Sequence, residues 1–173
     1  PTKNEPLINK LIENIHRKLS PYNHEIIIVD KSDVVPKIKG AKLVLQKSNG
    51  LGNAILEGLD HSTGNVVVTM DGDGSHRAQD LPKLIVALRK SDIVIGSKFI
   101  EGGKTLDLTH RKFISLIFRK LASFVLGLDL KDSMSGFSAI EREIFKEIKL
   151  SPWGYKIILE IVYKAKKKGY SFT

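Results

Sequence analysis

The chain has 173 residues, of which 42% are hydrophobic and 27% charged, a size and balance typical of one globular domain with a substantial core. It contains no cysteine, which excludes disulfide bonds and thiol catalysis, and no run of roughly 18 to 20 apolar residues that could cross a bilayer. The formal net charge of +9 favours anionic partners: nucleotides, phospholipid headgroups or nucleic acid.

The first half of the chain alternates helical and strand patterns. Apolar residues recur with helical period from Leu7 to Leu19, and Ser20-Pro21 ends that run. We then expect a buried strand over residues 25–30, a short strand around 43–45, a helix to about residue 60, a strand over 65–70, a helix over 80–90 and a strand over 92–96. This order is typical of an α/β fold with a mostly parallel central sheet and helices on both faces.

The second half is less regular. A helix is expected from Arg111 to about Leu126, and its apolar residues cover more than one face, with basic residues between them. Two interpretations stay open: a helix packed on two sides, or a basic amphipathic helix lying on a membrane surface. The remaining expected elements are a strand through residue 140, a short helix from about 142, a last helix over 155–168 and the start of a strand at 171–173.

Two carboxylates follow the central strand one residue apart. In an extended segment residues i and i+2 point the same way, so Asp71 and Asp73 can aim at one point. With no basic residue between them they repel each other unless a cation binds. Mg²⁺ or Mn²⁺ suits such an oxygen pair, and Mg²⁺ usually adds substrate phosphates. Gly72 and Gly74 let the backbone approach a bulky ligand. The alternative is a polar Asp/Gly turn at the end of a strand.

Polar residues also end two other expected strands. Asp30 ends the strand over 25–30, and Ser97 and Lys98 follow the strand over 92–96. In open α/β sheets ligands bind at the carboxyl ends of the strands. Three strand ends with polar groups therefore predict a ligand site at this edge of the sheet.

Several segments occur in the order in which one known family carries them. They are Pro1-Thr-Lys-Asn-Glu5, Ile26-Ile-Ile-Val-Asp30, Gly50-Leu-Gly52, Met70-Asp-Gly-Asp73, Ile95-Gly-Ser-Lys98, Asp132-Ser-Met-Ser-Gly-Phe137 and Gly154-Tyr-Lys156. Together they resemble the catalytic domain of family-2 glycosyltransferases, most closely the dolichol-phosphate mannose synthase group. The resemblance implies a nucleotide-diphospho-sugar transferase fold of the GT-A type. It also implies a single catalytic domain over residues 1–173, in which a first strand before Pro1 and a continuation after Tyr170 are missing.

The resemblance also implies roles for individual residues. The donor nucleoside would contact Pro1, Thr2, Lys3, Glu5, Val29 and Asp30. The metal, Mg²⁺ or Mn²⁺, would be held by Asp71, Asp73 and Ser75, and through it the diphosphate. Gly72 belongs to the expected cofactor-binding residues but not to the metal ligands. Lys98, in place of a family arginine, would pair with phosphate, and Asp132 would lie near the acceptor. Asp73, Asp132 and Lys98 form the expected catalytic set.

The implied reaction is the metal-dependent, inverting transfer of a sugar from a nucleotide-sugar donor to a polyprenyl or dolichyl phosphate. GDP-mannose is the favoured donor, and UDP-glucose is its main rival. The acceptor oxygen is already ionised and needs little help from a general base. Arg111, Lys112 and Arg119 could dock the lipid phosphate. The enzyme would then work at the cytoplasmic face of a membrane, bound peripherally or tethered by segments outside this chain; its oligomeric state stays open.

Three positions depart from the family pattern. Lys3 stands where a tyrosine is usual, Lys31 where a second aspartate is usual, and Ser75 where the mannose synthases tend to place glutamine. The first two bear on the choice of nucleoside, and the third weakens the expected metal coordination.

Other functions remain to be weighed. The stretch from Asp71 to Ser75 also matches the Asp-x-Asp-Gly-Thr/Ser pattern of haloacid-dehalogenase-type phosphatases, in which the first aspartate attacks phosphate. In that family the motif follows the first strand, whereas here a helix and two strands precede it. Lys31 and Ser75 suggest a third hypothesis, a non-catalytic nucleotide-sugar-binding subunit. Nucleic-acid binding is a weaker idea, because the basic residues are not interleaved with exposed aromatic ones.

Overall fold

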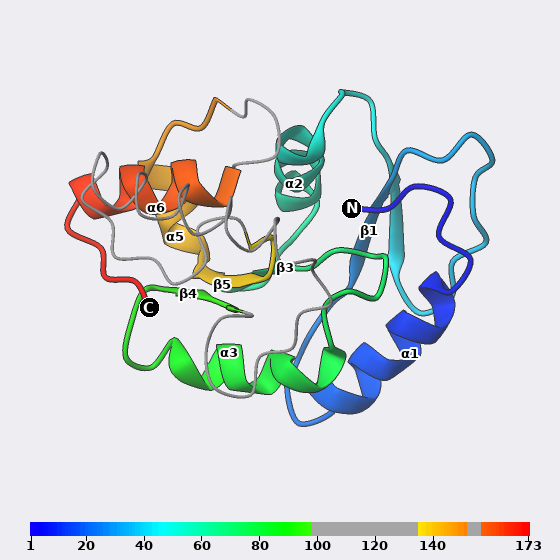
Figure 1. The fold of residues 1–173 in the computed structure, drawn as a ribbon, viewed down its shortest axis with the longest axis horizontal. Coiled ribbons are helices and arrows are strands. Elements are labelled where there is room, and N and C mark those ends of the chain that lie inside the picture. Colours follow the sequence, from blue (N-terminus) through cyan, green and yellow to red (C-terminus); the bar gives the residue numbers. More distant parts are fainter. Residues whose placement is uncertain (98–134, 152–156) are drawn as a thin grey trace, which may run out of the picture.

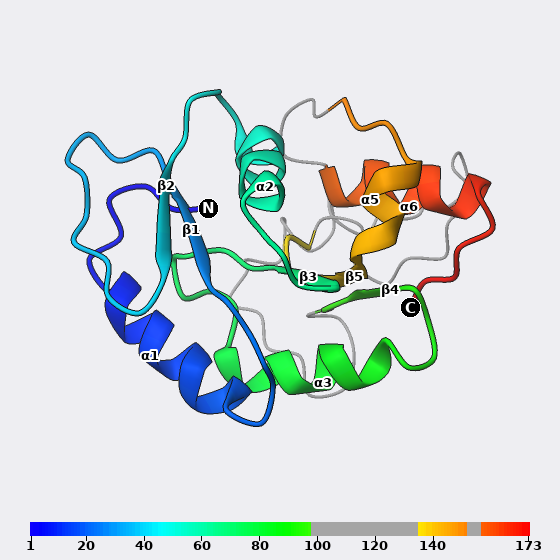
Figure 2. The same cartoon turned by 180° about the vertical axis from the view of Figure 1, so that it is seen from behind.

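The computed structural model describes residues 1–97, 135–151 and 157–173, which form three layers (Figure 1). The elements are α1 (Ile8–Leu19), β1 (Ile27–Asp30), β2 (Lys42–Leu45), α2 (Leu51–Asp60), β3 (Val66–Thr69), a 3₁₀ turn (Ala78–Asp80), α3 (Leu81–Ala87), β4 (Ile93–Ile95), β5 (Ser138–Glu141), α5 (Arg142–Glu147) and α6 (Ile157–Lys167). The strands form the middle layer. Helices α1 and α3 cover one face, and α2, α5 and α6 cover the other (Figures 1 and 2). The predicted α/β class with helices on both faces is confirmed.

The strand order contains one feature that the sequence pattern did not indicate. β1 pairs with β2 in parallel, from Ile27 opposite Lys42 to Asp30 opposite Leu45. β5 lies between β3 and β4 and runs antiparallel to both. β3 and β4 therefore point the same way, as expected of a mostly parallel sheet, but they are joined through an antiparallel strand. Residues 171–173 run beside β4, where Phe172 forms a parallel bridge with Ile93, as predicted for the start of a strand.

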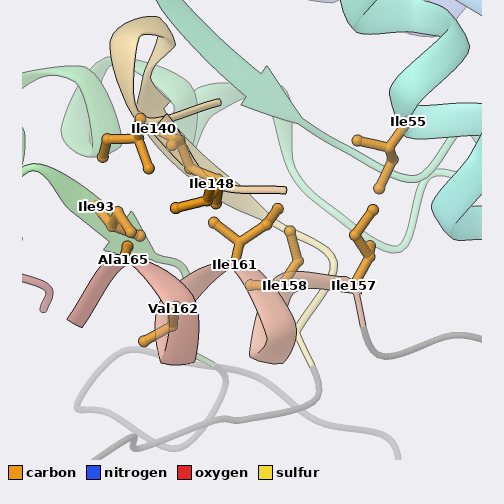
Figure 3. Close-up of a cluster of buried hydrophobic side chains, with 10 residues drawn as sticks. Ile55, Ile93, Ile140, Ile148, Ile157, Ile158, Ile161, Val162 and Ala165 are labelled. Carbon is orange, nitrogen blue, oxygen red and sulfur yellow. The ribbon is translucent and has the colours of Figure 1, made fainter. Parts of the chain in front are cut away.

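The main core is built from isoleucines between the sheet and helices α5 and α6 (Figure 3). Ile140 of β5, Ile144 of α5 and Ile161 of α6 have no exposed surface. The inward face predicted for the last helix is confirmed, and its buried residues are Ile157, Ile158, Ile161, Val162 and Ala165. A second cluster fills the space under α3 and includes Leu81, Leu84, Val94, Phe137 and Ala139. This packing fixes the ends of β3 and β5, where the site lies.

A cavity of about 720 Å³ separates β1 from β3. Its walls are residues 26–29 of the β1 segment, residues 66–71 of the β3 segment, and apolar side chains of α1, α2 and α3. Within the described ranges, β1 and β3 do not pair with each other, so the sheet consists of two parts.

Some predictions fall on residues that the structure does not describe. This group contains the expected helix over 111–126 with its basic residues, residues 155–156 at the start of the last helix, Lys98 and Asp132. Among the residues that are described, no helix is long and apolar enough to cross a membrane.

Candidate metal and nucleotide site

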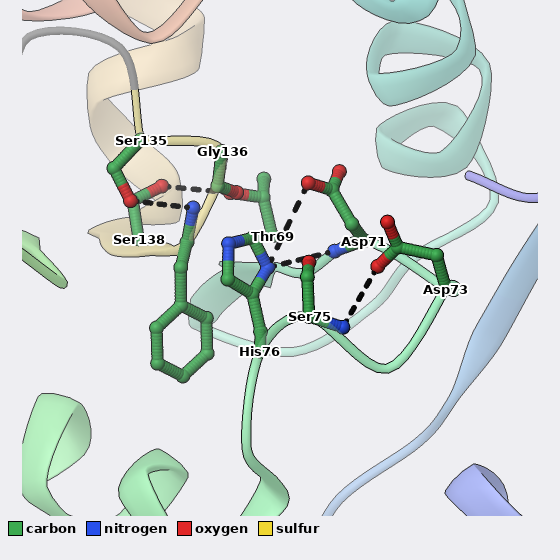
Figure 4. A network of polar contacts seen from close by, with 9 residues as sticks. Thr69, Asp71, Asp73, Ser75, His76, Ser135, Gly136 and Ser138 are labelled. Carbon is green, nitrogen blue, oxygen red and sulfur yellow. Dashed lines mark hydrogen bonds and ion pairs between the residues drawn. The ribbon is translucent and has the colours of Figure 1, made fainter. Parts of the chain in front are cut away.

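The acid pair lies just beyond the end of β3, and β5 holds that end in place (Figure 4). Thr69, the last residue of β3, faces Ser138 across the ladder. The Thr69 hydroxyl donates to the carbonyl oxygen of Gly136 at 2.7 Å and lies 2.8 Å from the Ser138 hydroxyl. These bonds join segments almost seventy residues apart and anchor the point from which the loop over 71–76 leaves the sheet.

Two internal hydrogen bonds shape this loop. The backbone N–H of Asp71 donates to Nδ1 of His76 at 3.1 Å, and the backbone N–H of Ser75 donates to Oδ1 of Asp73 at 2.9 Å (Figure 4). Gly74 has a φ of +78°, a conformation that side chains disfavour, so the turn depends on glycine there. The loop therefore presents both carboxylates from a closed turn.

The acid pair has the chemistry that a hard divalent cation requires. The Asp71 side chain is 38% exposed and Asp73 is exposed. Partial burial alone would raise the pKa of Asp73, but hydrogen bonds from the Ser75 hydroxyl and backbone N–H lower the pKa below its usual value. In the described part of the chain, neither carboxylate has a lysine or arginine partner within ion-pair distance. Two carboxylates that have no lysine or arginine partner among the described residues fit Mg²⁺ or Mn²⁺.

The pair does not complete a metal site by itself. The described residues hold no group of three or more histidines, cysteines or acids that could bind a metal ion. Further ligands would have to be oxygens of substrate or water, as is usual for Mg²⁺. Ser75, predicted as a ligand, hydrogen-bonds to Asp73 in this structure, and its role at the metal stays a prediction.

Pro1 and Thr2 connect the end of β1, where the nucleoside is expected, to the loop over 71–76, where the metal is expected. Thr2 forms a parallel bridge with Asp30 at the end of β1, and its hydroxyl donates to Asp30 Oδ1 at 2.7 Å. On the other side, the backbone N–H of Gly72 donates to the carbonyl oxygen of Pro1 at 3.2 Å. The structure therefore brings together Pro1, Thr2, Asp30 and Gly72. These residues come from three separate segments of the chain, and all four were expected at the same site.

Asp30 organises this junction from a buried position. It is 2% exposed, and its carboxylate also accepts hydrogen bonds from the backbone N–H and the hydroxyl of Ser32, at 2.9 and 2.8 Å. A buried carboxylate needs such donors. Asp30 thus ties the first loop to β1, while the contact with a nucleoside remains a prediction.

Gly72 is needed because of a neighbour that the sequence did not reveal. A Cβ at this position would overlap with Cγ2 of Thr2 and lie 3.1 Å from the carbonyl oxygen of Pro1. From the sequence, Gly72 is expected to let the backbone approach a bulky ligand. In the structure, Pro1 and Thr2 occupy the space next to Gly72.

The other predicted nucleoside contacts differ in exposure. Val29 is buried against Val44 and Ala54, so its side chain belongs to the core and its carbonyl oxygen accepts from the N–H of Thr2. Lys3 is exposed and Glu5 is half-buried. Their contacts with a nucleoside stay predictions.

Lys31 has a structural role that sequence reasoning missed. Its ammonium group donates to the carbonyl oxygens of Gln46 and Ser48, at 3.3 and 3.1 Å. The loop that it reaches is held from its other side by Glu57, which accepts the backbone N–H groups of Lys47 and Ser48 at 2.9 Å each. The Ser48 hydroxyl and these N–H groups lower the pKa of Glu57 to about 2. Nothing in the local sequence signals these contacts, which cross between β1, β2 and α2.

The family can be assigned from the whole chain. The model of the family described as "Glycosyl transferase family 2" matches residues 1–149. The chain belongs to glycosyl transferase family 2. The match sets aside the phosphatase interpretation of the Asp71–Ser75 motif.

Two curated members of this family are similar to the chain at 34% identity. One is a dolichol-phosphate mannosyltransferase of Pyrococcus furiosus, aligned over 96% of this chain and 51% of the relative. The other is an undecaprenyl-phosphate mannosyltransferase of Micrococcus luteus, aligned over 70% of this chain and 53% of the relative. The chain thus spans about half the length of these relatives.

A solved structure supports the GT-A type of fold. Glucosyl-3-phosphoglycerate synthase of Mycobacterium tuberculosis, in complex with Mn²⁺, UDP-glucose and phosphoglyceric acid, superposes with a TM-score of 0.67. The match covers 96% of this chain and 63% of that one, at 21% identity. It shows that the two chains share a fold.

Proposed function

We propose that this family-2 domain transfers a sugar, preferentially mannose from GDP-mannose, to a polyprenyl phosphate and uses Mg²⁺ or Mn²⁺. The observation that carries the proposal is the carboxylate pair of Asp71 and Asp73 beside the junction of Thr2 and Asp30, with no lysine or arginine partner among the described residues. The relatives named as mannosyltransferases of dolichyl and undecaprenyl phosphate support the acceptor class and the sugar.

The chemistry needs a positive charge at this place. As the glycosidic bond breaks, negative charge develops on the departing nucleoside diphosphate. A divalent cation between the carboxylates and the phosphate oxygens neutralises that charge. Asp71 and Asp73 would hold the cation, and the junction of Pro1, Thr2 and Asp30 would face the nucleoside. The roles of Lys98, Asp132 and Ser75 remain part of the proposal.

The acceptor places the enzyme at a membrane. A polyprenyl chain stays in the lipid, so the domain must approach the bilayer surface, peripherally or through segments outside this chain. The net charge of +9 favours an anionic surface. The expected position at the cytoplasmic face of the membrane stays part of this proposal.

Transfer and binding assays test the proposal. With Mn²⁺ and a polyprenyl phosphate, we expect a product from GDP-mannose, none after chelation of the metal, and less or none from UDP-glucose. Absence of product from any sugar nucleotide would overturn the proposed activity. GDP and UDP titrations with and without Mn²⁺ separate the remaining alternatives. A transferase that uses UDP-glucose binds UDP more tightly than GDP and forms product from UDP-glucose. A non-catalytic binding subunit, suggested by Lys31 and Ser75, binds a nucleotide without turnover.

We further infer that an extended segment upstream of Pro1 completes the sheet between β1 and β3. The support is the cavity of about 720 Å³ between these strands, with apolar helix faces on both sides. Thr2 forms a parallel bridge with Asp30 at the end of β1, and the carbonyl oxygen of Pro1 accepts the N–H of Gly72 in the loop that follows β3. A form of the chain that continues upstream with its natural residues should melt at a higher temperature than one in which those residues are replaced by serine and glycine. Equal melting temperatures would contradict the inference.

A further inference from the structure

The ring of His76 is held on two sides directly beside the acid pair. Its Nδ1 accepts the backbone N–H of Asp71 at 3.1 Å (Figure 4). The ring stacks on Phe137, with 4.9 Å between the ring centroids and 16° between the planes. The His76 side chain is only 19% exposed. The imidazole therefore has a defined position and a defined orientation.

The hydrogen bond decides the protonation of Nδ1. A nitrogen that accepts an N–H carries no proton itself, so His76 is the neutral tautomer with its proton on Nε2. The Asp71 carboxylate lies 3.8 Å from the same Nδ1. An ion pair at that distance would require a proton on Nδ1, which the backbone bond excludes. The shorter, directed bond to the backbone is the interaction that this geometry supports.

The hydrogen bond between Asp71 and His76 lies just beyond the last paired residues of β3 and β5. β3 pairs with β5 up to Thr69 opposite Ser138, and Asp71 lies two residues beyond. With its N–H bonded to His76, the segment from Asp71 to His76 is closed into a loop, inside which Ser75 is bonded to Asp73. The direction in which the Asp71 side chain leaves the backbone therefore depends on His76.

The support beneath the ring is rigid. The carbonyl oxygen of Phe137 accepts the N–H of Gly96 at 2.7 Å, and the N–H of Phe137 donates to the Ser135 hydroxyl at 3.2 Å. A Cβ at Gly96 would lie 2.5 Å from the Phe137 ring, so the ring is closely packed against β4. Contacts thus run from the core through Phe137 and His76 to the backbone of Asp71.

We propose that His76 is a positioning residue of the metal site, which aligns the Asp71 carboxylate with that of Asp73 by accepting the Asp71 N–H. This inference rests on the proposed function, since it assumes that the acid pair binds a divalent cation. Residues that orient metal ligands typically change metal affinity by about 10–100-fold when they are replaced. His76 does this as a hydrogen-bond acceptor and does not itself bind the ion through Nδ1.

Two substitutions separate the acceptor from the ring. His76→Phe keeps an aromatic ring to stack on Phe137 but removes the acceptor. His76→Asn keeps an acceptor oxygen near the Nδ1 position but removes the ring. Mn²⁺ binding, followed by electron paramagnetic resonance without donor, and thermal melting are measured for both variants and the natural chain.

The two measurements should rank the variants in opposite orders. We expect His76→Phe to lower Mn²⁺ affinity by about 10–100-fold and His76→Asn to retain most of it, whereas His76→Asn melts at the lower temperature. If His76→Phe binds Mn²⁺ like the natural chain, the proposal is wrong. It is also wrong if both variants lose affinity equally, because then the ring acts only through packing.

A third measurement does not depend on the metal. ¹⁵N spectra of the histidine rings, assigned with the His76 variants, should show a proton on Nε2 and none on Nδ1 of His76. A proton on Nδ1 would overturn the proposal even if Mn²⁺ binds. If the natural chain shows the expected tautomer but binds no Mn²⁺, the metal part of the proposed function fails, and with it the assignment of His76 to a metal site.

Discussion

The two parts of the sheet are held in different ways. The β3–β5–β4 part rests on a continuous isoleucine core in which Ile140, Ile144 and Ile161 are fully buried. In the β1–β2 part the described core consists of two clusters with three buried residues each, next to the cavity. There the ends of the strands are held mainly by polar bonds, such as those of Thr2, Asp30 and Lys31.

Because of this difference, we expect the stability of the fold and the binding of ligands to depend on different parts of the molecule. The loop over 71–76 directly follows β3, which belongs to the densely packed part. The core beneath β3 therefore determines the position of this loop. The expected nucleoside contacts lie on the polar side, where Lys3 is exposed and Glu5 is half-buried, whereas Val29 and Asp30 are buried. We expect core substitutions to act on unfolding, and substitutions at the junction of the two parts to act on ligand binding. Four experiments test this comparison.

The largest effect is expected in the isoleucine core. Ile161→Ala leaves a cavity among fully buried neighbours and should cost toward the upper end of about 2–5 kcal/mol in the free energy of unfolding. Ile28→Ala removes the same atoms beside an existing cavity, so its cost should lie toward the lower end. Urea unfolding measures both. Equal losses would show that the two parts are packed alike.

Loss of an acid should remove activity and leave folding intact. Asp73 is exposed, so Asp73→Ala should barely change the urea midpoint. Transfer activity should fall by about 10²–10³-fold, equivalent to about 2.7–4 kcal/mol, because a source of charge stabilisation is lost. Asp60→Ala, which removes an exposed acid at the end of α2, is the control and should retain activity. Full activity of Asp73→Ala would remove the acid pair from the mechanism.

The junction between the two parts can be strained by one methyl group. Gly72→Ala places a Cβ against Cγ2 of Thr2 and should destabilise the chain by about 1–3 kcal/mol, with weaker nucleotide binding. Thr2→Ser removes the opposing methyl group but keeps the hydroxyl that bonds to Asp30. The double variant should therefore recover much of the loss. Strictly additive effects of the two substitutions would indicate that they do not contact each other.

The smallest effect is expected from pH at the β1–β2 side. Hydrogen bonds from Ser48 and Lys47 lower the pKa of Glu57 to about 2 from its ordinary value of 4.5, so its stabilising contribution is complete above pH 4.5 and lost as the pH falls toward 2. Because Glu57 is half-buried and solvent still screens part of its charge, Glu57→Gln should cost no more than about 1 kcal/mol at pH 7. The difference from the natural chain should shrink between pH 4.5 and 2.5 in urea titrations. Glu13→Gln, on the exposed face of α1, is the control. A constant difference across this range would contradict the assignment.

The elements of the fold could be predicted from local pattern. The helical period before Ser20, the apolar run before Asp71 and the inward face of the last helix all appear in the structure close to the expected residues. Such patterns depend on neighbours within about two turns or one strand, which the sequence displays directly. The acid pair was found for the same reason, since its two members are separated by one residue.

The linear order could not place β5 or the contacts of the loop. β5 enters between β3 and β4 because Thr69 pairs with Ser138, and nothing near either residue encodes that register. The predicted helix over 80–90 begins with a 3₁₀ turn and ends at Ala87. The bond between His76 and Asp71 is local, but the stacking of His76 on Phe137 depends on a chain crossing seen only in three dimensions.

Residue types and their spacing by themselves determined the class of the fold, the family and the place of the charged pair, because each of these is written in short stretches of chain. Folding in space decided which strand supports the pair, why Gly72 must be a glycine, and which ring orients Asp71. The physical reason is that hydrogen bonds and packing act over a few ångströms, whereas the partners that they join lie up to 83 residues apart along the chain.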